Sequence, residues 1–321
     1  MPIYSYISLV YTLVNFELTV IGHISIDHIS LPSGNRYISI GGSPTYAGLT
    51  ASILDSKVQV ISKIGFDFEE TILKCFKKYQ IDVSNVKVSS NPTTSFELKY
   101  LKDWSRILRL LSRCDGIYPP ECQHFNSKGY LISPICSEIP LETLKFFADI
   151  DGFKVLDIQG FVRSFDKNGY VKIVRNCFLH KFLGHFNVIK CSLKELKYGL
   201  GFKDPCLCFK SLRDLGVKIL IVTLGSRGFY AFFEEECWFF PSYPISRIVD
   251  PTGCGDALNA GFLASILSSN DVVTAFAVGG ACASLVAESS GLNFLEHFND
   301  LDRRVDWLLK NSVKTRLICF G

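Results

Sequence analysis

The stretch from Ile248 to Ala264, IVDPTGCGDALNAGFLA, constrains this chain more than any other part of it. A turn leads into a corner with little side-chain bulk, Gly253, Cys254 and Gly255, and Asp256 then opens an apolar segment of good helix formers. The first N–H groups of a helix have no partner inside it, and with the helix dipole they bind anions, usually phosphate. An acid beside such a site can accept the proton of a hydroxyl that attacks the phosphate. The stretch therefore predicts a phosphoryl-transfer site.

A simpler interpretation of the same stretch is a strand-to-helix turn in which Asp256 only caps the helix. Two better-known nucleotide motifs do not fit. No Lys follows the glycines, as a P-loop requires, and Leu258 stands where the third Gly of a dinucleotide fingerprint belongs. The residues alone leave the capping turn and the phosphoryl-transfer site both open.

The letters DPTGCGD followed by ALNAGF resemble the second signature of the ribokinase-like (PfkB) carbohydrate kinases, usually written with Ala where Cys254 stands. The resemblance covers about residues 16–300. It implies ATP-dependent, Mg²⁺-assisted phosphorylation of a hydroxyl on a small molecule. Asp256 would then take the proton, while the N–H groups of Gly253, Cys254 and Gly255 stabilise charge on the transferring oxygens.

The fold class follows from two sources. Strands and helices alternate from Asp151 onward, which predicts a mostly parallel sheet. The resemblance implies an α/β fold of the ribokinase type, with three layers, α/β/α, and a small β-sheet lid. We expect one domain over residues 1–321.

Composition excludes several other classes. A chain of 321 residues with 48% hydrophobic and 20% charged residues can bury a large core and is not disordered. The net charge of +3 argues against nucleic acid as a partner. The twelve cysteines include no C-x-x-C pair, which is typical of a reducing compartment.

The N-terminal residues do not match a targeting signal. Residues 1–14 are apolar but lack the basic start and the cleavage site of a signal peptide. Asn15 and Glu17 end the apolar run before it could span a bilayer. We expect a cytoplasmic protein without a membrane partner, in which residues 1–14 are an extension or follow from an early start site.

The acceptor side is predicted near the N-terminus. A buried-strand pattern at 18–21 precedes GHISID, and open α/β sheets bind ligands where strands end. The pair Gly41–Gly42 lets a ligand approach the backbone. By resemblance, Asp27 accepts a substrate hydroxyl and the glycine pair is the hinge of the lid. Tyr46 stands where sugar kinases of the family often carry Asn, which argues against a ribokinase-type pentose pocket.

Two β-type alternations, 93–100 and 106–112, predict a hairpin. By resemblance, this hairpin joins the residues near 30–40 in a lid over the sugar, made of segments 29–42 and 92–114. A closed lid excludes the water that would otherwise take the phosphoryl group. Because a small sheet buries little by itself, such lids often pair, and we expect a homodimer formed through the lid.

A central strand at 153–157 ends in LDIQGFVR, which places Gln159 and Arg163 on the pocket side. In this segment the chain resembles myo-inositol kinases and their archaeal relatives. Both side chains could bind acceptor hydroxyls, and a surface position for Arg163 stays open.

The donor side is predicted at Lys190, Ser192 and Glu195. The last two fall on the family's N-x-x-E motif, which implies that Glu195 holds Mg²⁺ through waters. The same spacing also suits a capping box, and both can hold at once. Lys190 can bind a phosphate oxygen.

A second donor segment is TLGSRG, with Thr223, Gly225 and Gly228, which the family uses against the ribose and phosphates of the nucleotide. Its G-S-x-G order is not the G-x-S-x-G elbow of serine hydrolases, so a serine nucleophile is not indicated.

These features predict a kinase acting on a small polyol or sugar, with a myo-inositol-like acceptor favoured. A nucleoside kinase is the main alternative among enzymes. A kinase fold kept as a ligand sensor is the other, although a sensor has no use for Asp256 as a base. A thiol at a helix start should also have a lowered pKa, so Cys254 is predicted to be alkylated unless ATP covers it.

Overall fold

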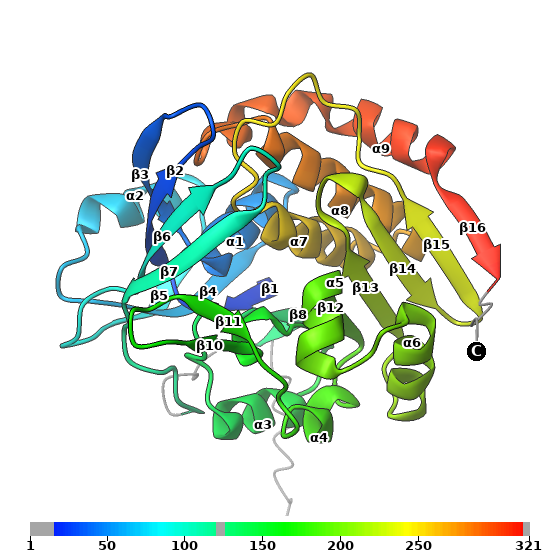
Figure 1. Ribbon diagram of the computed structural model, residues 1–321, viewed down its shortest axis with the longest axis horizontal. Helices are drawn as coiled ribbons and strands as arrows, with labels where there is room; N and C mark the ends of the chain where they lie inside the picture. Colours follow the sequence, from blue (N-terminus) through cyan, green and yellow to red (C-terminus); the bar gives the residue numbers. More distant parts are fainter. Residues whose placement is uncertain (1–15, 120–125, 317–321) are drawn as a thin grey trace, which may run out of the picture.

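A computed structural model describes residues 16–119 and 126–316 of the protein (Figure 1). The predicted extension at residues 1–14 lies outside these ranges. Within them, no helix combines the length and the apolar character needed to cross a membrane.

The core of the fold is a ten-stranded sheet whose strands are parallel from β13 to β5 and antiparallel from β13 to β16. This confirms the mostly parallel sheet. The strand order is β16 (Val313–Arg316), β15 (Glu236–Phe240), β14 (Phe229–Phe233), β13 (Ile219–Thr223), β12 (Val188–Ser192), β9 (Phe153–Asp157), β8 (Ser127–Ile132), β1 (Phe16–Ile21), β4 (Val58–Ile64) and β5 (Asp82–Val88).

Helices cover both faces of this sheet because its central strands are apolar on both sides. In β13, Leu220 belongs to one buried cluster and Ile221 to the other. One layer holds α1 (Ser43–Ile53), α7 (Cys254–Leu267), α8 (Val272–Ala287) and α9 (Leu301–Asn311), and the opposite layer holds α3 (Leu141–Asp149), α4 (His180–Leu183) and α6 (Pro205–Asp214) (Figure 1). The three predicted layers are confirmed.

Shorter elements complete the chain. They are α2 (Glu70–Lys78), α5 (Leu193–Glu195), the hairpin of β10 (Arg163–Phe165) and β11 (Val171–Ile173), and the helical turns η2 (Gln159–Phe161), η3 (Leu196–Leu200), η4 (Gly225–Arg227) and η5 (Asn293–Asp300). Small residues let α7 and α8 pack closely, since a Cβ on Gly279 would lie 2.6 Å from the Leu258 carbonyl oxygen. The β10–β11 hairpin was not predicted.

A separate small sheet has the order β3 (Arg36–Gly41), β2 (Ser25–Ser30), β6 (Ser95–Tyr100) and β7 (Arg106–Ser112). The predicted hairpin is confirmed as β6 and β7. Asp27 follows β1 after a short loop and lies within β2, where alternate residues are buried. The sheet therefore begins at Ser25, earlier than the segment 29–42 suggested.

Candidate active site

Two helices begin at the same place without a side-chain cap. Gly42 precedes α1 with φ 84°, and Gly253 precedes α7 with φ 83°, a conformation that glycine adopts at little cost. Among the described residues, no group accepts a hydrogen bond from the N–H of Gly253, Gly255 or Asp256. The start of α7 therefore offers several donors to an anion.

Cys254 does not contribute as predicted. Its N–H donates to the Pro251 carbonyl at 3.3 Å, so the free donors are those of its neighbours. Burial, reinforced by the charges of Asp250 and Asp256, raises the pKa of its thiol. The predicted lowering of that pKa is wrong, because desolvation and two carboxylates outweigh the helix dipole. Alkylation controlled by ATP is not expected.

Asp256 lies in the first turn of α7 and reaches across to the start of α1. Ser43 Oγ donates to its Oδ1 at 2.6 Å. Burial and the charge of Asp157 raise the pKa of Asp256, while the Ser43 hydrogen bond, Lys190 and Arg163 oppose the rise. A carboxylate with a raised pKa in a pocket is suited to accept a proton.

Asp256 shares one pocket with several other predicted residues. The pocket is lined by Ser25, Asp27, Gly42, Tyr46, Phe96, Leu98, Arg106, Leu108, Ile135, Gln159, Arg163, Thr252, Gly253 and Asp256. The small sheet supplies an apolar side to it, and the turns after β9 supply a polar side. Gly41, Cys254, Gly255, Lys190, Ser192, Glu195, Thr223, Gly225 and Gly228 do not line it.

Asp27 is buried in β2 and accepts a hydrogen bond from Ser25 Oγ at 2.8 Å. Burial is the main reason that its pKa rises to about 7. Gly41 lies directly against this carboxylate, since a Cβ there would be 2.1 Å from Asp27 Oδ2. The glycine pair thus makes room for Asp27 on one side and starts α1 on the other.

On the polar side, Arg163 lies in β10 and is not a surface charge. Its Nη1 donates to the Ile135 carbonyl and its Nη2 to Gln159 Oε1, both at 2.8 Å. Burial and the like charge of Arg106 lower the pKa of Arg163. Two arginines held in one pocket favour an anionic group between them.

Lys190 lies beneath the start of α7. Its Nζ donates to Asp157 Oδ2 at 2.7 Å and would be 2.9 Å from a Cβ on Gly255. Burial opposes its charge, but Asp157 and Glu195 raise the pKa of Lys190. Asn259 Nδ2 also donates to Asp157 Oδ2, at 3.0 Å. Asp157 therefore has its hydrogen bonds within the protein. Lys190 stays charged next to the free N–H groups.

The predicted capping box at the start of α5 is present. Ser192 Oγ accepts from the Glu195 N–H at 3.2 Å, and Glu195 Oε2 accepts from the Ser192 N–H at 2.7 Å. Burial works against the charge of Glu195, but Lys190 and Arg163 outweigh it and lower its pKa. An ionised carboxylate suits Mg²⁺, so the residues present fit the predicted ion, with Glu195 as its ligand through waters.

The second predicted donor segment follows the next strand of the sheet. Thr223 ends β13, Gly225 opens η4 with φ 66°, and Gly228 follows it with φ 106°. A Cβ on Gly225 would meet no atom within 4 Å, so the backbone there is open. Because β12 and β13 are parallel neighbours, this turn lies at the same edge as Ser192.

Two residues of the site escaped sequence reasoning, one that lines the pocket and one that lies behind it. Arg106 begins β7 on the small sheet, with its side chain exposed at the pocket. Desolvation alone would lower its pKa, but Tyr100, by its hydrogen bond and charge, and the charges of Glu195 and Asp256 raise it. The alternation of side chains along the strand could have identified Arg106. It shares a strand face with Leu108, so a charged residue stands at a position that faces the pocket. Ser43 gave only the weaker signal of following the glycine pair.

Tyrosines of the small sheet hold the turn before α7. Asp250 Oδ1 accepts from the N–H and the hydroxyl of Thr252 at 2.9 and 2.6 Å. Tyr37 donates its hydroxyl to Asp250 Oδ2, and the Tyr100 and Thr252 hydroxyls are 2.9 Å apart. The Tyr46 ring packs under Gly253, where a Cβ would lie 2.2 Å from ring carbon Cγ. These contacts fix the geometry of the anion-binding turn.

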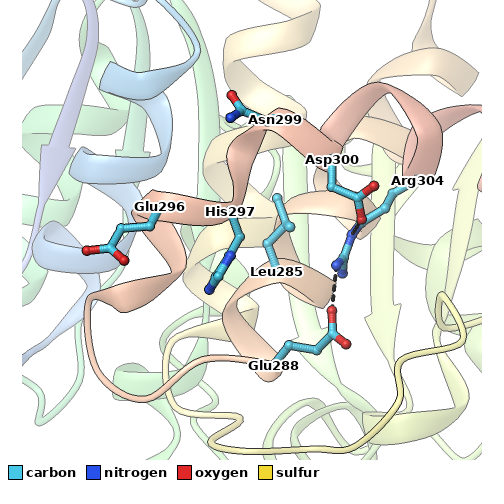
Figure 2. A pocket seen from close by; sticks show the side chains of 7 residues that line it. All are labelled: Leu285, Glu288, Glu296, His297, Asn299, Asp300 and Arg304. Carbon is cyan, nitrogen blue, oxygen red and sulfur yellow. Dashed lines mark hydrogen bonds and ion pairs between the residues drawn. The ribbon is translucent and has the colours of Figure 1, made fainter.

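Two other groups of polar residues are structural. A larger hollow of about 620 Å³ lies between α8, η5 and α9, but its Arg304 is paired with Glu288 and with Asp300, at 2.9 Å (Figure 2). His23, Cys136 and Glu138 cluster in the interior. Glu138 already accepts three backbone N–H bonds, so the cluster does not form an open metal site.

The model of the pfkB family of carbohydrate kinases matches residues 16–297. The chain belongs to this family. It is 30% identical to a cytidine kinase of Thermococcus kodakarensis over 77% of this chain and 87% of that one. It is 24% identical to an inositol 3-kinase of Arabidopsis thaliana over 79% of this chain and 69% of that one.

Solved structures of the family agree with the fold. A pyrophosphate-dependent kinase in the ribokinase family, solved with a pyrophosphate analogue and myo-inositol, has a TM-score of 0.75 at 24% identity. The match covers 89% of this chain and 99% of that one. The fold is thus the ribokinase fold, and the chain is a carbohydrate or nucleoside kinase of the PfkB family.

Proposed function

We propose that this protein is an ATP-dependent kinase that phosphorylates a hydroxyl of a small polyol or sugar, with a myo-inositol-like acceptor favoured. One observation carries the proposal. Asp256, a half-buried carboxylate with a raised pKa, stands in the same pocket as Asp27 and at the uncapped start of α7. Such a pocket can hold an alcohol and a phosphoryl group together, which is what in-line transfer requires.

The acceptor is proposed to bind between Asp27 and Asp256. Asp27 accepts one of its hydroxyls, and Gln159 and Arg163 on the polar side bind others. The Gly41–Gly42 hinge brings the small sheet over the acceptor and excludes water. Asp256 orients the reacting hydroxyl and takes its proton, which leaves late in a loose transition state.

The donor is proposed to bind with its phosphates at the start of α7. The free N–H groups of Gly253 and Gly255 face the transferring oxygens, with the charge of Lys190 behind them. Arg106 and Arg163 balance the developing negative charge from the small sheet and from β10. When bound through Glu195, Mg²⁺ would neutralise phosphate charge.

The residues that bind the rest of the donor are assigned from the family resemblance. Ser192, Thr223, Gly225 and Gly228 are proposed to hold the nucleotide along the carboxyl ends of β12 and β13. The open backbone at Gly225 supports this role. The pyrophosphate-dependent neighbour makes pyrophosphate the alternative donor to test.

A nucleoside kinase is the second candidate, and the apolar side of the pocket favours it. Phe96, Leu98 and Leu108 of the small sheet face the pocket and could pack on a planar base. The cytidine kinase relative supports the same candidate. The ligand-sensor alternative lacks such support, because the family is one of kinases.

An acceptor panel separates the candidates. Purified protein with Mg²⁺ and either ATP or pyrophosphate would be offered myo-inositol, hexoses, pentoses and nucleosides, with the phosphorylated product identified by mass spectrometry. We expect ATP-dependent product from a cyclitol or sugar. Product from nucleosides alone would select the second candidate, and no product with any acceptor or donor would contradict the catalytic proposal.

A homodimer formed through the small sheet and a cytoplasmic location both stay predictions. Ile38 and Ile107 on strands β3 and β7 are 65% and 43% exposed, which leaves apolar surface available for pairing. Light scattering on the purified protein would give the oligomeric state.

A further inference from the structure

We infer that Ser43, oriented by Ser133, is a positioning residue for the base: it keeps Asp256 ionised and reserves one of its two carboxylate oxygens for the acceptor. This inference rests on the proposed role of Asp256. It assigns a task to two serines that lie 90 residues apart in the chain and meet beneath the pocket.

The direction of each hydroxyl proton follows from the contacts. Ser43 Oγ accepts from Ser133 Oγ at 2.8 Å and, at the longer distance of 3.4 Å, from Gln159 Nε2. A hydroxyl has one proton and two acceptor positions. With both acceptor positions of Ser43 taken, its own proton points to Asp256 Oδ1, 2.6 Å away.

The serines are placed for this task by secondary structure. Ser43 is the first residue of α1, directly after the Gly42 cap, and Ser133 follows the last residue of β8. Both side chains are fully buried. Their hydrogen bonds therefore act where water does not compete, and each bond polarises the next.

The two carboxylate oxygens of Asp256 differ in their hydrogen bonds. Oδ1 accepts from Ser43, while Ser133 Oγ lies 3.5 Å from the same oxygen with its single proton directed to Ser43. Within residues 16–119 and 126–316, no group donates to Oδ2. Because Asp256 lines the acceptor pocket, Oδ2 is the oxygen left to take the proton.

The chain of hydroxyls also opposes the effect of burial. Burial and Asp157 raise the pKa of Asp256, and the Ser43 hydrogen bond acts in the opposite direction, together with the charges of Lys190 and Arg163. A base must be unprotonated at working pH to act. Without Ser43, a larger fraction of Asp256 would be protonated, and its side chain would also lose the contact that orients it.

The test is the pH profile of kcat for Ser43→Ala, measured with saturating donor and the best acceptor of the panel. We expect the acidic limb to move up by about one pH unit, since hydrogen bonds to charged groups are worth one to two pKa units. On that limb kcat should fall about tenfold and recover at alkaline pH. KM for both substrates should stay within about twofold.

Ser43→Thr restores the hydroxyl and should return the limb toward its original position. Ser133→Ala should shift the limb in the same direction but by less, and it replaces Ser43→Ala as the test if that variant does not fold. Thr50→Val is the matched control, because it removes a buried α1 hydroxyl that has no partner. Its profile should be unchanged.

A Ser43→Ala profile that superimposes on the unmodified one, or a loss of kcat equal at every pH, would overturn the inference. Asp256→Asn in the same assay separates this from a failure of the proposed function. If Asp256→Asn is inactive while the Ser43→Ala profile is unshifted, only the serine role falls. If Asp256→Asn is fully active, the assignment of the base falls.

Discussion

Helices α7 and α8 are neighbours that pack on each other, yet they begin in opposite ways. The start of α8 is capped: Asp271 Oδ1 accepts from the N–H groups of Val273 and Thr274, both at 3.0 Å. The start of α7 has a glycine instead, and among the described residues nothing accepts from the N–H groups of Gly253, Gly255 and Asp256. A protein gives up about 1 kcal/mol when it omits a cap. In the proposed function, the phosphate of the donor takes the place of a side-chain cap at the start of α7.

Apart from removal of the base itself, the largest effect is expected from Gly253→Ala. Its Cβ would meet the Tyr46 ring at 2.2 Å, and φ 83° is strained for any residue with a Cβ. The turn must shift, and losing one aligned donor costs about 3 kcal/mol of barrier, or about a hundredfold in kcat. Steady-state kinetics would measure it.

Gly216→Ala is the control for backbone strain alone. Gly216 has φ 110° but lies in the turn between α6 and β13. It should lower the melting temperature and leave kcat unchanged. A Gly253→Ala enzyme with normal kcat would mean that the uncapped start of α7 is not the phosphoryl site.

A smaller effect, with opposite signs for activity and stability, is expected from Asp27→Asn. The pKa of Asp27 is raised to about 7, so the folded state binds its proton more tightly than the unfolded state. Stability is then lost as pH rises from about 4 to about 7. The Asn variant should be more stable than the unmodified protein at pH 8 and equally stable at pH 4.

The same variant should lose affinity for the acceptor, seen as a raised KM with the donor KM unchanged. Melting temperatures at the two pH values and acceptor kinetics at pH 8 measure both halves. Equal stabilities of the Asn variant and the unmodified protein at pH 8 would show that burial of the Asp27 carboxylate does not destabilise the fold.

The smallest effect is expected at the capped helix. Asp271→Ala should cost about 1 kcal/mol of unfolding free energy and leave kcat and KM unchanged, because it removes only the α8 cap. Denaturant unfolding measures the loss. A fall in kcat comparable to that of Gly253→Ala would contradict the claim that only the start of α7 takes part in catalysis.

The sequence predicted those parts of the molecule that depend on local patterns. The β-branched run before Thr223 and the glycine corner before Asp256 each identify their element without help from distant residues. The family resemblance then ordered these elements into one fold. Both succeeded for the fold, because local sequence patterns mark where strands end and where helices start.

The failures depend on tertiary contacts and on burial, which local patterns do not show. The Ser43 hydroxyl donates to a carboxylate 213 positions away, and the spacing in the sequence does not predict this contact. Arg106 reaches the pocket only because β7 joins β6 beside β2. The pKa of Cys254 was predicted from its own helix, while burial and Asp250 set its direction.

The most direct measurement is the turnover of Asp256→Asn compared with its binding of ATP. If Asp256 is the base at an uncapped helix start, kcat should fall about a thousandfold or more, because general-base catalysis contributes about 10²–10⁴. The dissociation constant for Mg–ATP, measured by calorimetry, should stay within about threefold. Near-normal kcat in this variant, or loss of ATP binding equal to the loss of turnover, would contradict the account.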